Sequence, residues 1–337
     1  MKTGLQVSNG NPAQRKACVA TAGRICPRDY RYDPTVFARP AELATEVLYV
    51  AGGLYGNFAA LDAIEALAIH ERTRPTIVFN GDFHWFDAER DWFAEVDARV
   101  AQYRAVRGNV ETELAREDDV GAGCGCVYPA SVGDDVVQRS NQVLSHLQVT
   151  ARAQRHRLER LRKLSMHLVA EVADVRVGII HGDAHSLAGW SFAREALDEP
   201  GSSRWLDQVR RRSRIDVFAS THTCLAALRQ FELPHGRLTV INNGAAGMPN
   251  FSRSRCGLIS RIASRASPVT PVYGMLHCGV HIDALAIEYD TPAFLRRFLA
   301  HWPEGSPAQV SYHARILGGP NYTIEQARPK VPLHFAV

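Results

Sequence analysis

The sequence lacks a long apolar run and lacks the apolar core of a secretory signal. No uninterrupted apolar stretch approaches the ~18 residues that a transmembrane helix needs. Residues 1–16, MKTGLQVSNGNPAQRK, are polar and rich in Gly and Asn, which is not the pattern of a signal peptide. We therefore expect a cytoplasmic protein with no membrane partner.

The sequence also lacks the paired cysteines of a disulfide framework or a zinc knuckle. There are seven cysteines, an odd number, which favours free thiols in a reducing compartment. Cys124-Gly-Cys126 is too closely spaced for the usual C-x-x-C knuckle, and no second pair is nearby. Two interpretations stay open for it, a Gly-rich loop beside a pocket or a redox pair.

Charge is nearly balanced, which gives little reason to expect a nucleic-acid partner. The net charge is +4, and 46% of the 337 residues are hydrophobic, as in ordinary globular proteins. The arginine-rich stretch 152–163 is most simply the solvated face of a helix. The length suits about two domains or one large one.

A strand–helix–strand pattern opens the ordered part of the sequence. Apolar runs at 47–51 and 76–80 flank a segment in which apolar residues recur at helical spacing. Such units join parallel strands, so we predict an α/β fold. A second helix is predicted over 88–106, ending at Gly108-Asn109 as at a helix C-cap.

The rest of the chain predicts further strands and helices. We expect one long helix over 134–164, strands at 167–173, 175–180, 216–219 and 238–241, and helical sequence over 189–213. Segment 272–289 predicts two antiparallel strands, and a last helix over 293–301 precedes a Pro/Gly-rich tail. The predicted organisation is an N-terminal extension (1–46), one domain (47–290), and a C-terminal helix and tail (291–337) packed on that domain.

Polar residues follow several of these predicted elements. Asp82, His181 and His222 each come directly after a predicted strand, and Asn109 follows a predicted helix. Ligands gather at the carboxyl ends of strands in open α/β sheets. Carboxylate, amide oxygen and imidazole suit one divalent transition metal, namely Mn, Fe, Zn or Ni. Such a positive site attracts phosphate.

The order of the motifs resembles that of the calcineurin-like metallophosphoesterase superfamily. Members carry D-x-H-G-N, G-D-x-x-D, G-N-H-D/E, H-G, G-H-x-H and an N-P-G-S-like loop. This sequence offers, in the same order, Gly53-Leu54-Tyr55-Gly56-Asn57, Gly81-Asp82, Gly108-Asn109-Val110-Glu111, His181-Gly182, Thr221-His222-Thr223-Cys224 and Asn243-Gly244-Ala245-Ala246-Gly247. The resemblance covers about 47–290. It implies a four-layer α/β/β/α sandwich of two mixed sheets.

The resemblance implies that one of the family's two metal sites is intact. Its ligands would be Asp82, Asn109, His181 and His222. The other site would use Gly53, Tyr55, Asp82 and Cys224, of which Gly53 has no ligand atom and Cys224 could bind only as a thiolate. The expectation is a metal-dependent phosphoesterase-like hydrolase of phosphomonoesters or phosphodiesters with a single-metal centre.

Further site residues follow from the same resemblance and from nearness in sequence. His84, Asp183 and His185 are candidates for catalysis, because Val110 replaces the family's general-acid histidine. Asn57, Gly81 and Gly108 are expected around the bound group. The expected substrate is a phosphorylated small molecule or a nucleotide.

Several alternatives stay open. The lost ligands also suit an inactive descendant that binds a phosphorylated ligand or a protein partner. The loop 51–56 fits a relaxed A-x-G-x-x-G, as in a dinucleotide fold, although the later histidine motifs would then go unexplained. His181 and His222 could be core histidines, Asp82 a turn residue and Cys224 a small buried hydrophobe.

Overall fold

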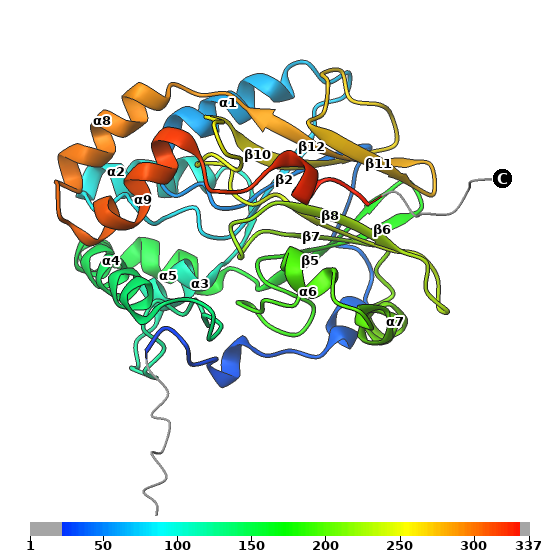
Figure 1. Ribbon diagram of the computed structural model, residues 1–337, viewed down its shortest axis with the longest axis horizontal. Helices are drawn as coiled ribbons and strands as arrows, with labels where there is room; N and C mark the ends of the chain where they lie inside the picture. The colour runs from blue at the N-terminus through cyan, green and yellow to red at the C-terminus, as the bar shows by residue number, and fades with distance from the viewer. Residues whose placement is uncertain (1–21, 331–337) are drawn as a thin grey trace, which may run out of the picture.

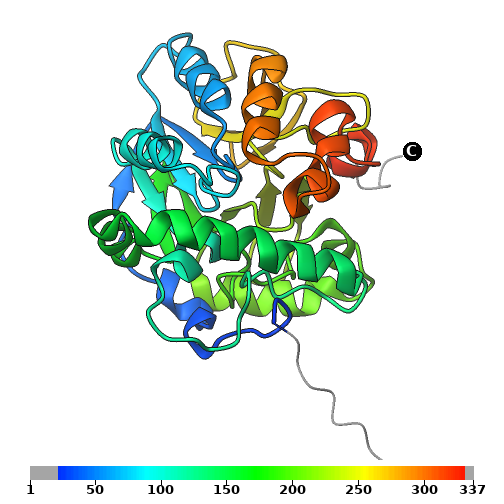
Figure 2. The same ribbon diagram turned by 90° about the vertical axis from the view of Figure 1, so that its left-hand side faces the viewer.

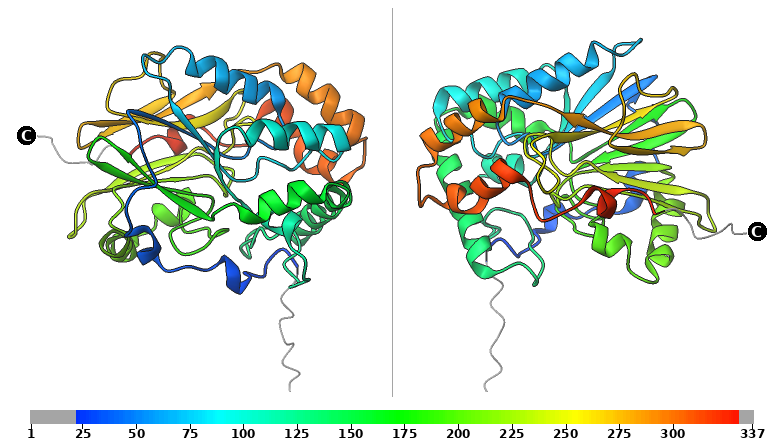
Figure 3. Two further views of the ribbon diagram at one scale, coloured as in Figure 1. Left: turned by 180° about the vertical axis from the view of Figure 1, so that it is seen from behind. Right: turned by 45° about the horizontal axis from the view of Figure 1, so that its top comes forward.

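Two six-stranded mixed sheets form the centre of the molecule. The computed structural model describes residues 22–330, and helices cover the outer face of each sheet (Figure 1). The two sheets lie face to face (Figure 3). This arrangement confirms the predicted four-layer α/β/β/α sandwich.

The first sheet has the strand order β11-β12-β10-β2-β3-β4. Strands β2 (Val47–Ala51), β3 (Thr76–Asn80) and β4 (Arg104–Val106) are parallel. Strands β10 (Gly257–Ala263), β12 (Val280–Ile287) and β11 (Tyr273–His277) continue it in antiparallel pairs. Helices α1 (Phe58–Ala68), α2 (Arg90–Val100) and α8 (Thr291–His301) lie on its outer side (Figure 1).

The second sheet has the order β1-β5-β6-β7-β9-β8. Its strands are β1 (Leu43–Ala44), β5 (His167–Val172), β6 (Val175–Ile180), β7 (Val217–Ser220), β9 (Leu238–Asn242) and β8 (Ala227–Phe231). Helices α6 (Arg194–Leu197) and α7 (Ser202–Ser213) and the short turns η1 (Arg28–Tyr30) and η2 (Pro34–Phe37) lie outside it.

Burial on both faces explains why the strands read as continuous apolar runs. Leu48 and Val50 of β2 point into the core between the sheets, where they join Val177 and Ile179 of β6. Tyr49 of β2 points outward into the core beneath the helices. Because both faces are covered, β2 needs no polar residue at alternate positions.

A third group of helices closes the end of the sheets where β2, β3, β6 and β7 finish. It comprises α3 (Asn109–Ala115), α4 (Asp134–Arg152), α5 (Arg155–Lys163) and α9 (Pro307–Gly318). The short helix α10 (Ile324–Ala327) is not part of this group and packs against β8. Figure 2 shows the long helix α4 running across this end, and α9 packs against it. These helices therefore cover the strand ends that carry the predicted ligands.

Several predicted boundaries are wrong. The last residues of the predicted 88–106 helix, Arg104–Val106, form strand β4 and pair with β3. Asn109 therefore begins α3 and does not end a helix. The predicted 134–164 helix breaks between α4 and α5, and 189–213 contains two helices. Strands β8 and β10 and helix α9 were not predicted. Among residues 22–330, no helix is both long and apolar enough to cross a membrane.

Candidate metal centre

Four strand-end loops bring Asp82, Asn109, His181 and His222 together. All four side chains are buried. The Nε2 atom of His181 lies 3.0 Å from Asn109 Oδ1 and 3.0 Å from His222 Nδ1. It lies 3.4 Å from Asp82 Oδ2. The predicted ligand set therefore converges on one point.

The outer atoms of three of these side chains bind backbone carbonyls. His181 Nδ1 lies 2.9 Å from Asn80 O, and His222 Nε2 lies 3.0 Å from Cys126 O. Asn109 donates through Nδ2 to Cys124 O at 2.9 Å. A carbonyl only accepts, and a neutral imidazole carries one proton, so each outer nitrogen holds the proton of its ring.

The side-chain atoms that face the centre of the cluster therefore all carry a free lone pair. They are two imidazole nitrogens, one amide oxygen and one carboxylate oxygen. Such atoms repel one another unless a cation lies between them. Bonds of ~2.1 Å in a tetrahedral metal site place neighbouring ligand atoms about 3.4 Å apart, close to the observed separations. The residues present therefore fit a divalent transition metal.

The titration behaviour of the cluster agrees with a need for positive charge. Burial lowers the pKa of His181, but the Asp82 carboxylate outweighs this effect and raises it above its usual value. Burial and the neighbouring His181 lower the pKa of His222 to about 3. A proton on His181 and a metal ion would therefore compete for the centre of the cluster.

The loops that carry Asp82 and Asn109 are held by Glu111. Its carboxylate accepts hydrogen bonds from the backbone N–H groups of Gly108 (2.8 Å) and Asp82 (2.9 Å). A Cβ on Gly108 would lie 2.3 Å from Asp82 Oδ1, and a Cβ on Gly81 would lie 2.6 Å from His181 Nδ1. Both glycines therefore let the two loops approach each other closely.

The second metal site that the family resemblance implies lacks suitable ligands at Gly53, Tyr55 and Cys224. A Cβ on Gly53 would lie 2.9 Å from the Tyr55 ring, so the tyrosine fills the space of a side chain at 53. The Tyr55 hydroxyl lies 2.9 Å from Cys224 Sγ. Burial raises the pKa of both groups, which disfavours the phenolate and thiolate forms that bind metal. Among the described residues, Cys224 lies outside the cluster formed by Asp82, His181 and His222.

His84 is buried away from the pocket. Its ring stacks on Phe93 at 4.0 Å between centroids, and its Nδ1 lies 2.5 Å from Asp87 Oδ2. Burial lowers the pKa of His84, but Asp87 outweighs this and raises it to about 9. These contacts make His84 part of the core beneath the loop.

The other candidates from sequence also lie outside the pocket. Asp183 accepts N–H groups of its own loop, from His185 (2.8 Å) and Ser191 (3.0 Å), and the His185 side chain is exposed. Asn57 caps α1 through the N–H of Ala60 and donates to Gly247 O at 3.0 Å. These bonds give Asp183 and Asn57 roles in holding their loops.

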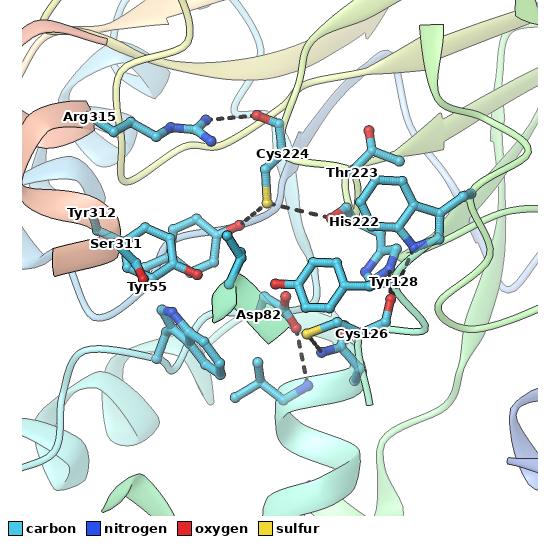
Figure 4. Close-up of a pocket in the computed structure, with 15 residues that line it drawn as sticks. Tyr55, Asp82, Cys126, Tyr128, His222, Thr223, Cys224, Ser311, Tyr312 and Arg315 are labelled. Carbon is cyan, nitrogen blue, oxygen red and sulfur yellow. Dashed lines mark hydrogen bonds between the residues drawn. The ribbon is translucent and has the colours of Figure 1, made fainter. Parts of the chain in front are cut away.

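A pocket of about 200 Å³ opens beside the cluster (Figure 4). Asp82, Asn109 and His222 line it together with five aromatic rings, those of Tyr55, Trp85, Tyr128, Trp190 and Tyr312. Arg315 of α9 also lines the pocket and donates to Cys224 O at 2.7 Å. Sequence reasoning missed Tyr312 and Arg315, because their segment reads as a tail.

The Cys124–Cys126 segment is a loop beside this pocket, as one of the two interpretations predicted.

The loop 51–56 is not shaped to bind a dinucleotide. Its backbone is buried, and several of its N–H groups are already bonded inside the protein, namely those of Gly53, Tyr55 and Gly56. A pyrophosphate needs such groups free at a helix N-terminus.

Solved structures with a similar fold include a metallophosphoesterase. A metallophosphoesterase from Sphaerobacter thermophilus matches with a TM-score of 0.50 and 15% identity, over 82% of this chain and 99% of that chain. The chain has the metallophosphoesterase fold. A hypothetical protein from Pyrococcus horikoshii OT3 also has a similar fold, with a TM-score of 0.55 and 16% identity over 82% of this chain and 99% of that chain. No protein-family model and no curated protein matches the sequence.

Proposed function

We propose that the protein is a metal-dependent phosphoesterase-like hydrolase with a single divalent transition-metal ion. One observation carries the proposal: each of four side chains turns an atom with a free lone pair toward the centre of the cluster. The other polar atom of each side chain is bonded to a backbone carbonyl or a backbone N–H group. The metallophosphoesterase fold supports the reaction class. The substrate would be a phosphorylated small molecule or nucleotide, either a phosphomonoester or a phosphodiester.

Asp82, Asn109, His181 and His222 would hold the ion. A bound ion would supply a Lewis acid and would lower the pKa of a bound water. The chain itself orients the ligands, since the Val110 N–H holds Asp82 Oδ1 at 3.2 Å and leaves Oδ2 facing His181. The aromatic walls would limit the access of water, and Arg315 would place a positive charge near a phosphate bound in the pocket.

Metal analysis of the purified protein tests the proposal. After chelation and reloading with Mn²⁺ or Zn²⁺, we expect about one ion per chain by elemental analysis. His222→Ala should lose the ion, whereas His70→Ala, at an exposed histidine, should keep it. Wild-type protein with no bound ion, indistinguishable from His222→Ala, would contradict the proposal.

A second candidate is a protein that binds a phosphorylated ligand without turnover. Val110 stands where the family resemblance places a general-acid histidine, and it lines the pocket. Hydrolysis of bis(4-nitrophenyl) phosphate by the metal-loaded protein separates the two candidates. Turnover that disappears in Asp82→Asn but persists in Asp174→Asn, an exposed turn residue, would exclude this second candidate.

A further inference from the structure

The aromatic rings of the pocket beside the ligand cluster differ in burial. Two of them, Tyr55 and Trp85, are buried. The other three rings are only half-buried, and they are those of Tyr128, Trp190 and Tyr312. Ring surface that stays open to water inside a pocket is apolar surface that a ligand can cover, and covering it is favourable.

The rings lie on more than one side of the site. In the view of Figure 4, the rings of Tyr55 and Tyr312 lie to the left of Asp82, and the ring of Tyr128 lies to its right. They come from three distant parts of the chain, namely the loop after β2, helix α9 and the loop before α4. Aromatic surface therefore flanks the place where a bound phosphoryl group would lie.

The polar atoms of three of these rings are already bonded inside the protein. The Tyr128 hydroxyl lies 2.9 Å from Ser140 Oγ, and Trp190 Nε1 donates to Cys126 O at 3.0 Å. The Tyr55 hydroxyl has a thiol partner, as described above. A ligand in the pocket therefore meets the faces and edges of these rings more than their polar ends.

Contacts between rings fix their orientation. Trp190 packs against Tyr128 at 6.0 Å between centroids, and edge-on against His222 at 5.4 Å and 77°. Tyr312 packs edge-on against Trp85 at 6.5 Å and 86°. Rings that are held in advance lose little conformational freedom when a ligand binds. Because His222 is a proposed metal ligand, the aromatic wall begins at the metal centre itself.

We propose that the pocket recognises a flat aromatic ring carried by the phosphoester, either an aryl group or a nucleobase, in preference to an aliphatic substituent of similar size. The inference rests on the proposed function and narrows its substrate class. Aromatic rings pair in offset-stacked or edge-to-face arrangements and gain affinity beyond the burial of apolar area. A saturated ring buries as much apolar surface but has no π-face to pair.

Two stable anions that differ only in their ring test the preference without turnover. Methyl(phenyl)phosphinate and cyclohexyl(methyl)phosphinate carry the same charge and no ester bond, but only the phenyl ring is flat. Calorimetry on wild-type protein loaded with Zn²⁺ should show the phenyl compound binding about threefold to tenfold more tightly. Equal or tighter binding of the cyclohexyl compound would overturn the inference, because the pocket would then respond to apolar area alone.

A second pair of ligands distinguishes the two sources of the ring. Adenosine 5′-sulfate and ribose 5-sulfate carry the same anion with and without a base. Where the phenyl preference holds, binding of the adenosine compound that is about tenfold tighter assigns the ring to a nucleobase. Equal binding of the two sulfates assigns it to an aryl group close to the phosphorus.

Replacing single rings by leucine tests where the preference arises. Tyr312→Leu and Tyr128→Leu keep apolar bulk and remove a ring, so each should reduce the preference for the phenyl compound. Tyr103→Leu provides the matched control, because Tyr103 is a half-buried tyrosine outside the pocket. Full preference retained in both pocket variants would overturn the inference.

Elemental analysis of the same samples separates failure of this inference from failure of the proposed function. A bound ion without a preference for the phenyl compound contradicts only the recognition of an aromatic ring. Absence of a bound ion in the wild-type protein contradicts the proposed function instead.

Discussion

His181 Nε2 and His222 Nδ1 lie 3.0 Å apart, and the other nitrogen of each ring faces a backbone carbonyl. Two lone pairs at this separation are stable only with a proton or a metal ion between them. The proposed metal binding would therefore be linked through this pair to protonation and to stability.

Chelation should destabilise the protein. An ion that binds only the folded chain stabilises it by about 2.7 kcal/mol when its free concentration is 100 times the Kd. Scanning calorimetry with and without a chelator should show a lower Tm in its presence. His222→Ala should melt at the same temperature in both conditions, whereas His70→Ala should respond as the wild type does.

Metal affinity should rise with pH. The Asp82 carboxylate outweighs burial and raises the pKa of His181, so a proton on His181 Nε2 competes with the ion below that pKa. Deprotonation as pH increases removes this competitor, and the ion should bind more tightly. Titrations with Zn²⁺ between about pH 5 and 8 should show this trend. An affinity independent of pH over that range would contradict the protonated cluster.

Gly108→Ala should abolish metal binding. The added methyl group would lie 2.3 Å from Asp82 Oδ1 and 2.8 Å from the Asp82 backbone nitrogen, so the ligand loop must move. We expect a loss of more than about 2 kcal/mol in the free energy of unfolding. Gly318→Ala provides the matched control, because a Cβ there meets nothing within 4 Å. Denaturant unfolding and elemental analysis measure both effects.

His84 should stabilise the protein in a pH-dependent way. Asp87 overcomes burial and raises the pKa of His84 from 6.5 to about 9, so its contribution is complete below pH 6.5 and disappears as pH rises through 9. His84→Gln should therefore cost roughly 3 kcal/mol more near pH 6 than near pH 10. Denaturant unfolding at both values measures the difference. A cost equal at the two pH values would mean that the imidazole is neutral throughout.

The sequence predicts which residues gather in the Asp82–His181–His222 cluster better than it predicts the residues that line the pocket. Asp82, His181 and His222 follow strands whose apolar runs are long enough to recognise, and their order in the chain matches the family motifs. Asn109 was placed after a helix, because the three-residue strand β4 before it has one buried residue and no periodic pattern. The sequence therefore places this candidate ligand in the cluster, although the local structure that it predicts around Asn109 is wrong.

The pocket walls depend on tertiary packing. Tyr312 and Arg315 lie on α9, which begins at Pro307, four residues after Pro303. These prolines make the segment resemble an irregular tail in the sequence, whereas in the structure it is a helix that packs against α4. His84 is a candidate for catalysis in the sequence because it lies two residues from Asp82. Asp87, three residues further along the same loop, is the partner that holds the imidazole inside the core.

The order of synthesis has a consequence for the pocket. The four candidate ligand residues have all been added to the chain once His222 is made, but Arg315 and Tyr312 follow some 90 residues later. Strand β10, which completes the pairing of β2, is also made after the ligands. A chain shortened before Pro307 would keep every ligand residue and lose the wall that α9 provides. Under the proposed function, the residues that would hold the ion are therefore made well before the α9 residues that line the pocket.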